Sequence, residues 1–467
     1  MMGRAERVRT GLLVVIALAG CEAERNPSEP MRDAGRDGET PRQRAEVRDS
    51  GSQAVVRDSD SGAATWSQDA GSDPPPDLSA DAGPQEPNDA AVIFPDSGST
   101  ALQALDVAGD RGPRGLILAK LVSGRGYSCG ASTSGRLVCW GDGSFGSLGT
   151  GVYSDTQLAP VAVEAVGFPG ASERLAAGGF NTCAIDADKV LRCCGDTVEG
   201  LLPTGSTDSN VLGPAGPVPI PNAPERVRHI ALGYDRNGVL IDDAEGTASY
   251  WNSTGAIAHL EGLSGLKAAS TGGEHWCALT GDNGVKCWGR TAFGALGDGQ
   301  PHIYEPHVQT AMDVVGLASG VKKVVNGWNH ACALTEEGGV KCWGIRGMLG
   351  NGAESNVPVD VPGLSSGVRA LSTSHRHTCA LTESELVCWG WNFHGQLGIE
   401  QGMEGAGTVD VPTAVPGIEA AAVRAISTGY SHTCVSFKEG GAACWGQNHI
   451  LGVVTGNTRT PTAIQGL

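Results

Sequence analysis

The sequence predicts an all-β chain whose second part is a seven-bladed β-propeller, and three observations support this fold class. Glycine is abundant, with 70 residues in 467, and only 5% of residues are aromatic, which favours many short strands joined by tight turns. One stretch, residues 273–289, places Thr280-Gly281-Asp282-Asn283-Gly284 between two short apolar runs, a pattern typical of a β-hairpin. The same pattern returns in stretches that begin at Gly327, Ser374 and Gly429 and, less clearly, at Gly124 and Gly179.

The first 20 residues have the form of a bacterial export signal. Arg4, Arg7 and Arg9 precede an apolar run that is too short to span a bilayer comfortably. The run ends in Leu18-Ala19-Gly20-Cys21, which resembles the lipobox of bacterial lipoproteins, whose cysteine receives a lipid and becomes the new N-terminus. We therefore predict a lipoprotein signal peptide at residues 1–20 and a chain anchored to the cell envelope, at the outer membrane or cell surface, through Cys21 alone. The alternative is an ordinary secretory signal with an incidental cysteine.

Residues 21–110 are predicted to form a disordered, acidic tether. They are rich in Asp, Ala, Gly, Ser and Pro, so they cannot bury enough apolar surface to offset the entropy of ordering. Their Asp-Ser-Gly and Asp-Ala-Gly pieces show no fixed register of calcium ligands. Residues 1–114 carry 12 basic and 20 acidic side chains and residues 115–467 carry 21 and 31, so both parts are net negative (−8 and −10). A partner with a phosphate backbone requires a basic face, and we therefore predict no nucleic-acid partner.

From residue 115 to residue 467 the chain repeats with a period of about 50 residues. Six copies carry a pair of cysteines, and the first cysteines of successive copies are Cys129, Cys183, Cys277, Cys332, Cys379 and Cys434. The gap between the second and third of these is 94 residues, against 47–55 elsewhere, so a copy without cysteines is predicted between them. Residues 226–251 fill this gap, with Gly233 and Trp251 at the expected places, which makes seven units.

Each unit is predicted to contain four short strands. In the last unit a strand at residues 423–426 leads to Gly429, and a hairpin follows with Cys434 on one arm and Cys444 on the other. A Leu-Gly turn at residues 451–452 then precedes an extended piece around Pro461. Four short strands in about 50 residues describe one propeller blade. A blade cannot cover both of its own faces, so neighbouring blades bury them, and seven blades can close into a ring.

Three motifs recur at this spacing: His-x-Cys-Ala-Leu, as at residues 275–279, Cys-Trp-Gly, as at 287–289, and Gly-x-Leu-Gly, as at 294–297. Together they resemble the regulator of chromosome condensation repeat, over about three quarters of the chain. The resemblance implies a seven-bladed β-propeller. The chain departs from the family in two units, because the third has lost its cysteines and the second has Cys194 where the family has Trp.

The founding member of that family is a nuclear exchange factor that acts on a small GTPase and is bound to chromatin. An exported, acidic bacterial chain has access to neither, so this function is not carried over. A secreted bacterial inhibitor of β-lactamases is similar in fold and is the better analogy for how such a ring works.

The paired cysteines are predicted to form disulfides. Cysteines ten positions apart around a central turn lie directly opposite each other on a hairpin, with Cα atoms about 4.5–5.5 Å apart. Each bond is expected to contribute on the order of 2–3 kcal/mol through loop entropy. The alternative is that they are buried thiols that fill the blade cores. The predicted pairs are Cys129–Cys139, Cys183–Cys193, Cys277–Cys287, Cys332–Cys342, Cys379–Cys388 and Cys434–Cys444. Cys194 is left over, either exposed and able to pair between chains or buried as a thiol.

Histidine and tryptophan recur once per unit at fixed positions. One histidine per blade is spread around a ring, so we interpret the set as structural hydrogen bonds to backbone rather than as metal ligands or acid–base groups. This set is His275, His330, His377 and His432, with Asn181 and Tyr127 in its place in units two and one. Trp140, Trp288, Trp343, Trp389 and Trp445 share one register and are predicted to pack between blades.

Aromatic residues outside these registers are candidates for exposed interface anchors. They are Trp276, Trp328 and Trp391, with Phe145, Phe293 and Phe393 in the Gly-x-Leu-Gly turns. Trp328 stands in Gly-Trp-Asn-His, which resembles a motif of a plant ultraviolet photoreceptor built on the same repeat, but a single copy does not predict light sensing. The loops that vary most from unit to unit are residues 151–159, 203–216, 299–305, 351–357 and 400–409, and recognition is expected to use them.

No motif in the sequence predicts catalysis. Gly141-Asp-Gly143-Ser-Phe-Gly146 matches a nucleotide-binding pattern, but no helix pattern follows it. We therefore predict a non-catalytic protein-binding propeller with no catalytic residue, cofactor, metal or small-molecule substrate. The alternatives are a structural envelope protein, or a propeller hydrolase or lyase with its site at one mouth of the channel. An enzyme requires charged residues that converge at one mouth, whereas a binding module predicts an aromatic and acidic patch on one rim.

Overall fold

The structure is a computed structural model that describes most of the repeat region. It describes residues 111–112, 115–151, 158–168, 174–186, 188–196, 217–220, 223–224, 226–234, 238–242, 246–251, 257–260, 263–290, 292–300, 308–400, 407–447, 450 and 457–467. All of them belong to one compact unit, Pro74–Leu467. The predicted signal peptide, the lipid on Cys21 and the tether lie outside the described residues, as do loop 203–216 and most of loops 151–159, 299–305 and 400–409.

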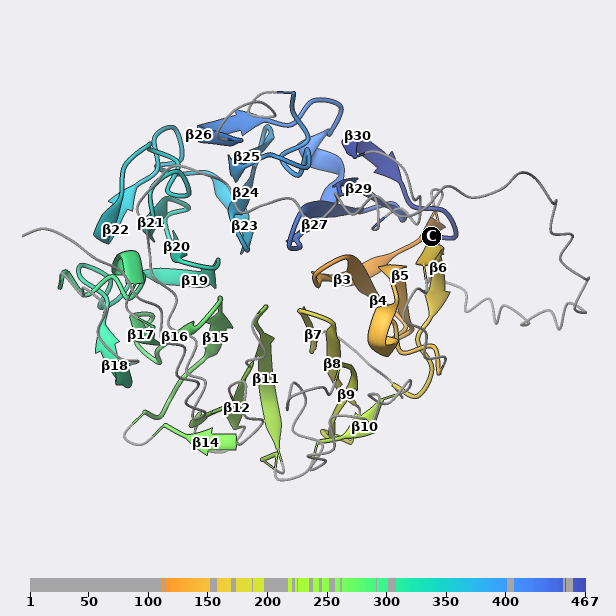
Figure 1. The fold of residues 1–467 in the computed structure, drawn as a ribbon, viewed down its shortest axis with the longest axis horizontal. Helices are drawn as coiled ribbons and strands as arrows, with labels where there is room; N and C mark the ends of the chain where they lie inside the picture. The colour runs from red at the N-terminus through yellow and green to blue at the C-terminus, as the bar shows by residue number, and fades with distance from the viewer. Residues whose placement is uncertain are drawn as a thin grey trace, which may run out of the picture. The chain divides into compact units, whose positions relative to one another are not determined.

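The described residues form seven four-stranded antiparallel sheets around one axis, and each sheet is a blade (Figure 1). Within each blade the strands lie in chain order, with the first strand next to the axis. Blade one consists of β3 Leu118–Ser123, β4 Tyr127–Ser132, β5 Leu137–Asp142 and β6 Leu158–Glu164, and blade two of β7 Leu175–Gly178, β8 Asn181–Ile185, β9 Leu191–Gly195 and β10 Val218–Pro219. Blade three consists of β11 Val227–Leu232, β12 Gly238–Asp242, β13 Ala248–Trp251 and β14 Ile257–His259, and blade four of β15 Ala268–Thr271, β16 His275–Leu279, β17 Val285–Gly289 and β18 Val308–Asp313. Blades five to seven consist of β19 Val321–Asn326, β20 His330–Thr335, β21 Val340–Gly344 and β22 Ser355–Asp360; β23 Val368–Ser374, β24 His377–Thr382, β25 Leu386–Trp391 and β26 Thr408–Ala414; and β27 Val423–Thr428, β28 His432–Phe437, β29 Ala442–Gly446 and β30 Thr458–Ala463. The prediction of an all-β propeller is confirmed.

Short elements accompany the blades. A two-stranded hairpin, β1 Arg111–Gly112 with β2 Gly115–Leu116, precedes the first blade. Three single-turn 3-10 helices, η1 Ser144–Gly146, η3 Ala292–Gly294 and η4 Ala420–Ala422, lie in the connections. No helix in the described part of the chain has the length and apolarity that crossing a membrane requires.

The ring is closed by contacts between its first and last blades. The innermost strand β27 of blade seven contacts β3 of blade one, as each innermost strand contacts the next. Leu116, Leu118 and Trp140 pack with Cys434 and Ile464 in one buried cluster. Two backbone hydrogen bonds join the ends of the propeller, from Gly441 N to Leu116 O (3.0 Å) and from Ala162 N to Gln465 O (3.0 Å). The ends of the repeat region therefore lock the circle.

The recurring tryptophans pack between blades, in agreement with the sequence interpretation. Trp140, Trp288, Trp343, Trp389 and Trp445 are all almost fully buried. The Trp343 indole donates to Ala295 O in blade four (2.9 Å), and the Trp389 indole donates to Met348 O in blade five (3.0 Å). In both cases the acceptor lies in the Leu-Gly turn of the preceding blade. Each ring therefore fixes one blade against the turn of its neighbour.

All six predicted cysteine pairs are disulfides. Each pair lies directly opposite on the second and third strands of its blade, with Cα atoms 4.1 Å apart. The bonds are fully buried and lie within single blades. Disulfides in this number indicate an oxidising compartment outside the cytoplasm.

Cys194 is the free cysteine of the described residues, and it is buried. It takes the position of the recurring tryptophan on β9 and packs in a cluster with Leu148 and Phe168. Burial raises the pKa of its thiol to about 12. Of the two sequence alternatives, the buried thiol is the observed one.

One predicted anchor, Trp276, is wrong. Its side chain is 5% exposed, and its ring stacks on Trp288 with centroids 6.3 Å apart and planes 11° apart. The matching positions in other blades hold Ser, Thr, Ala or Gly, so this tryptophan adds volume where blade four meets blade three. Blade three has no disulfide, and the interface beside it is filled instead by Ile241, Leu266 and the two tryptophans.

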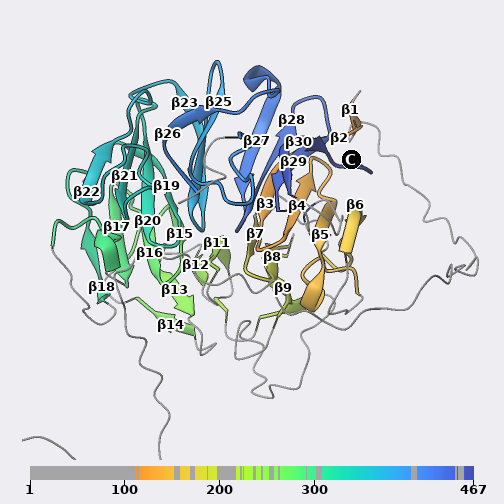
Figure 2. The ribbon, with the colours of Figure 1, turned by 45° about the horizontal axis from the view of Figure 1, so that its top comes forward.

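The two ends of the ring differ in what they carry. Because the sheets are antiparallel and in chain order, the turn after the first strand and the loop after the third strand lie at the same end of each blade. In blade four, Trp276 pairs at this end with Thr271 of β15 and with Trp288 of β17. We call this end of the ring the A–B face, and Figure 2 shows the blades standing side by side around the axis. Of the variable loops predicted for recognition, residues 351–357 are described throughout, and they follow the third strand of blade five at the A–B face.

We predict that thiol titration of the denatured, non-reduced chain finds at most two free thiols among its 14 cysteines, those of Cys194 and Cys21. In the native protein, Cys194 resists alkylation because it is buried and its thiol pKa is raised to about 12. Reduction in denaturant exposes all of the paired cysteines and serves as the control. A titre of twelve or more thiols before reduction contradicts the disulfides.

Candidate functional site

The turns between the first and second strands bring aromatic and basic side chains to one mouth of the ring. Each turn begins at a glycine or serine and then presents one prominent side chain. These side chains are Arg125, Phe180, Tyr234, Glu274, Trp328, His375 and Tyr430 in blades one to seven. Glycine is required at two of the turns because a Cβ at Gly327 or Gly429 would lie 2.0 Å from the ring of His330 or His432. The tight turn therefore follows from the histidine packed beneath it.

The recurring histidines hydrogen-bond to hydroxyl groups of the following blade. His330 Nε2 lies 2.9 Å from Thr373 Oγ1 in blade six, and His377 Nε2 lies 2.9 Å from Thr433 Oγ1 in blade seven. The expected structural role is thus observed, but the partner is a side chain of the next blade rather than backbone. His275 lacks such a hydroxyl because Ala331 occupies the threonine position, and its Nε2 has no partner.

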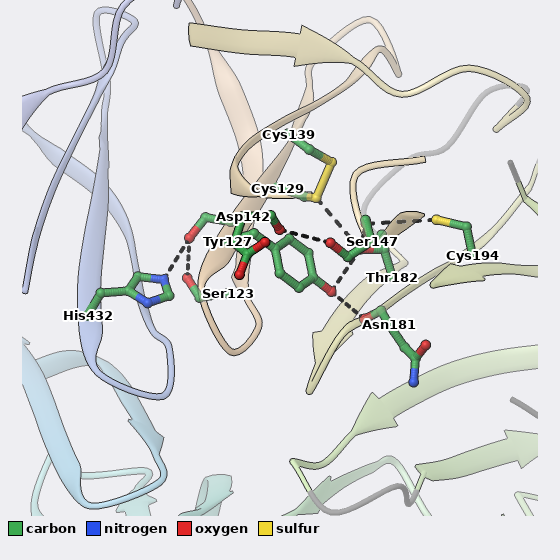
Figure 3. Close-up of a disulfide and its surroundings, with 11 residues drawn as sticks. Ser123, Tyr127, Cys129, Cys139, Asp142, Ser147, Asn181, Thr182, Cys194 and His432 are labelled. Carbon is green, nitrogen blue, oxygen red and sulfur yellow. Dashed lines mark hydrogen bonds between the residues drawn. A yellow bond between two sulfur atoms is a disulfide. The ribbon is translucent and has the colours of Figure 1, made fainter. Parts of the chain in front are cut away.

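We call these inter-blade hydrogen bonds the histidine ladder, and they continue across the ring closure (Figure 3). His432 Nε2 of blade seven lies 3.0 Å from Ser128 Oγ of blade one. Tyr127, which replaces histidine in blade one, donates to Asn181 O of blade two (2.5 Å) and accepts from Thr182 Oγ1 (2.9 Å). Tyr127 therefore performs the same inter-blade function as the histidines. The histidines lie one per blade, and no group of three or more metal-ligating side chains comes together within the described residues.

Arg376 of blade six lies between two tryptophans. Its guanidinium carbon is 5.1 Å from the centroid of the Trp328 ring and 5.3 Å from that of Trp391. Trp391 in turn stacks on Phe393, with centroids 5.9 Å apart and planes 19° apart. Phe393 is 47% exposed, so this end of the group reaches the surface.

Arg125 of blade one has the same kind of environment. Its guanidinium carbon is 5.2 Å from the centroid of Phe180 in blade two and 5.3 Å from that of Tyr430 in blade seven. Phe145 lies against Phe180, with centroids 4.9 Å apart. The chain thus places an arginine between two aromatic rings twice on the A–B face.

His375 joins the two groups at the centre of the mouth. Its ring stacks on Tyr430 with centroids 3.8 Å apart and lies 4.4 Å from Trp328. Tyr234 of blade three reaches across the axis, where its hydroxyl hydrogen-bonds with Ser374 and its ring lies 5.8 Å from Tyr430. Rings and guanidinium groups of six blades therefore form one continuous cluster, which we call the aromatic–arginine mouth: Arg125, Phe145, Phe180, Tyr234, Trp328, His375, Arg376, Trp391, Phe393 and Tyr430.

The mouth and the channel beneath it are basic. The seven innermost strands, as described, contain six Lys and Arg residues and no Asp or Glu. Enclosure by the ring and the nearby Lys120 lower the pKa of Lys323 to about 8. His229 lies on the innermost strand of blade three. Burial, together with the charges of Lys120 and Lys323, lowers the pKa of its imidazole to about 4. The aromatic–arginine mouth therefore carries positive charge where an acidic patch was expected. Asp313, Asp360 and Glu336 lie on outer strands or on a turn at the other end of the blades, and Glu274 in the turn of blade four is paired with Arg290 (3.1 Å).

The structure unites four of the five predicted binding residues. Trp328, Trp391, Phe393 and Phe145 belong to the mouth, whereas Phe293, which is 39% exposed, makes no ring contact with it. Sequence reasoning missed Arg125, Phe180, Tyr234, His375, Arg376 and Tyr430. The signal was present, because most of these residues occupy the positions between the turn glycine and the histidine of each repeat.

The comparisons with known proteins agree with this architecture. Two family models, both described as the regulator of chromosome condensation (RCC1) repeat, match residues 385–436 and residues 321–345 and 368–396. The chain is 26% identical over 331 residues to the ultraviolet-B receptor UVR8 of Arabidopsis thaliana, covering 65% of this chain and 70% of that protein. It is 27% identical over 361 residues to the E3 ubiquitin-protein ligase HERC2 of Homo sapiens, covering 72% of this chain but only 7% of that relative.

A solved structure shows the same fold. Prp20p from Saccharomyces cerevisiae superposes with a TM-score of 0.61 at 20% identity, covering 74% of this chain and 88% of that one. The protein is thus an all-β propeller. It carries repeats of the regulator of chromosome condensation type.

The histidine ladder predicts a loss of stability on acidification. Burial lowers the pKa of His330, His377 and His432 to about 3, against about 6.5 in an unfolded chain. Because the unfolded state takes up protons first, the stabilisation is complete above about pH 7 and is lost as the pH falls from about 6.5 towards 3. Each histidine contributes about 1.4 kcal/mol per pH unit to this slope.

The measurement is the free energy of unfolding in urea at several pH values between about 7.5 and 4.5. His432→Asn, which places in blade seven the amide that blade two carries as Asn181, is expected to reduce the slope by about one histidine. The same slope in the variant and the parent contradicts the assignment.

Proposed function

We propose that this chain is a non-catalytic, protein-binding propeller that engages its partner through the aromatic–arginine mouth. The single observation that supports this most strongly is the continuity of the cluster, which joins rings and two guanidinium groups from six blades on the face that also bears the variable loops. Tryptophan, tyrosine and arginine are the residue types that dominate binding energy at protein interfaces. A rigid ring supports them with little loss of entropy on binding.

The chemistry of the mouth supports binding rather than catalysis. Ser374 lies at the mouth, but its Oγ is hydrogen-bonded with Tyr234 and accepts from His375 N (2.6 Å). The side-chain nitrogens of His375 have no hydrogen-bond partner among the described residues, so this imidazole does not activate the serine. A serine hydrolase requires a base within hydrogen-bond reach of the nucleophile.

The relatives offer an analogy for the mode of action. Prp20p, whose fold this chain shares, has binding properties towards Gsp1p and histones, which are proteins. This supports a propeller of the same type as a scaffold for protein recognition, while the identity of 20% carries no particular partner over.

We place the propeller at the bacterial cell envelope, held by a lipid on Cys21 and separated from the membrane by residues 22–110. Leu18-Ala19-Gly20-Cys21 supports the anchor, and six disulfides are consistent with an oxidising compartment. A single acyl chain binds membranes only marginally, and stable anchoring requires more than one.

The anchor predicts that a clickable fatty acid supplied to bacteria that express the full chain labels it, and that the label is lost in Cys21→Ser. The control is Cys194→Ser, which keeps the signal sequence and removes the other unpaired cysteine. Labelling that persists in Cys21→Ser places the lipid elsewhere, and no labelling of the parent refutes a lipid anchor.

The binding face is tested by photo-crosslinking from two phenylalanines beside Gly-x-Leu-Gly turns. Phe393 and Phe293 lie one position apart in the corresponding turns of blades six and four and are both exposed, but only Phe393 belongs to the mouth. A photoreactive phenylalanine at position 393 is expected to give a discrete adduct in envelope preparations, weakened at least about tenfold by Trp328→Ala, in the range of an interface hot spot. Position 293 gives no matching adduct. Equal adducts from both positions, or none from 393, contradict the proposed face.

A further inference from the structure

We infer that the partner presents an acidic peptide segment to the aromatic–arginine mouth, with carboxylates paired to Arg125 and Arg376. This inference rests on the proposed function and specifies the chemistry of the ligand at the same face. It follows from which surfaces of the rings and guanidinium groups are already used, and from the distribution of charge around the ring.

The faces of the aromatic rings are largely occupied within the protein. Trp328 contacts the Arg376 guanidinium group and the His375 ring, and Trp391 contacts the same guanidinium group and Phe393. Tyr430 contacts the Arg125 guanidinium group and His375. A sugar stacks on a free aromatic face, so these rings are poorly disposed to bind one. Ring edges carry the positive end of the quadrupole and favour an anionic neighbour.

The two arginines present the edges of their guanidinium groups. A guanidinium group stacked between rings keeps its N–H donors in its own plane, where they fit both oxygens of a carboxylate. Neither Arg125 nor Arg376 forms an ion pair with a carboxylate of the described residues. Arg125 is exposed and Arg376 is half-buried, so both positive charges remain available for an ion pair with a bound segment.

His375 supplies a second, independent indication of a ligand. It is 2% exposed, lies between the two arginine groups, and neither of its ring nitrogens has a hydrogen-bond partner among the described residues. A neutral imidazole carries one N–H donor and one acceptor, and buried polar groups in native proteins are nearly always paired. A carboxylate at the centre of the mouth is the acceptor that this N–H lacks.

The charge distribution selects an acidic segment over other anions. The chain has a net charge of −18, yet its seven innermost strands hold six Lys and Arg residues and no acidic residue within their described bounds. A nucleic acid, with its long run of phosphates, would be repelled by the acidic outer surface. A short acidic segment places its charges over the basic axis and avoids that surface.

The first described residues lie at the other end of the ring. β2 is joined to the turn between β28 and β29 by the hydrogen bond from Gly441 N to Leu116 O (3.0 Å), and that turn lies opposite the A–B face. Arg111 and Gly112, which pair with β2, therefore lie on the far side from the mouth. This placement favours a segment of a partner protein as the occupant.

The test measures fluorescence anisotropy of a labelled peptide of about 12 residues that alternates Glu and Ser, titrated with the full-length chain at low and moderate salt. We expect binding that weakens with salt, and at least about tenfold weaker binding by Arg125→Gln/Arg376→Gln. Arg376→Lys keeps the charge but loses the planar fork, and is expected to bind with intermediate affinity. The control is Lys438→Gln, an exposed lysine in the turn between β28 and β29 at the opposite end and outside the innermost strands, which leaves binding within about twofold.

Several outcomes overturn the inference. These are no binding of the Glu peptide by the full-length chain, equal binding of a matching Gln peptide, equal losses in the double variant and in Lys438→Gln, and tighter binding of polygalacturonate than of the Glu peptide. If sedimentation shows that the chain is a dimer, and Arg125→Gln/Arg376→Gln dissociates that dimer, the mouth binds a second copy of the chain. That result also overturns the inference. A crosslink from position 393 that survives Arg125→Gln/Arg376→Gln refutes the acidic chemistry while the proposed binding face stands.

Discussion

The structure depends on one constraint: a four-stranded blade has two apolar faces and can bury neither of them alone. Blades five and six direct a tryptophan at the turn of the preceding blade and a histidine at a hydroxyl of the following one. Other blades vary this arrangement. The variations are informative, because Trp276 thickens the interface beside the blade that lacks a disulfide, and Cys194 occupies a tryptophan site and donates its thiol to Ser147 O in the turn of the preceding blade (3.8 Å).

The same contacts release the turn residues for other uses. Because the histidine beneath the turn in blades five, six and seven is hydrogen-bonded to the next blade, the residues that follow the turn glycine or serine carry little structural demand and vary between blades. Six of the seven blades place a ring or a guanidinium group in the cluster at the axis. A repeated scaffold thus produces a surface that is not repeated, and recognition requires such a surface.

The fold could be predicted from the sequence because its determinants are local and periodic. The spacing of Cys277 and Cys287 defined the hairpin, and the long gap before Cys277 revealed a blade without cysteines. The mouth was only half predictable, since Trp391 and Tyr430 occupy different positions of the repeat and are brought together only by packing against His375. The sign of its charge was predicted wrongly because net charge averages over the whole surface, whereas the fold places basic side chains inside and carboxylates outside.

The confinement of every disulfide to a single hairpin has a consequence for biosynthesis. The two cysteines of each bond are nine or ten residues apart, so they enter an oxidising compartment almost together, before the next pair arrives. The two cysteines that arrive together are thus the correct partners, and oxidation in order of arrival gives the native pairing without reshuffling. The circle itself contains no covalent bond between blades among the described residues, so its assembly waits for the last strand and is settled by packing alone.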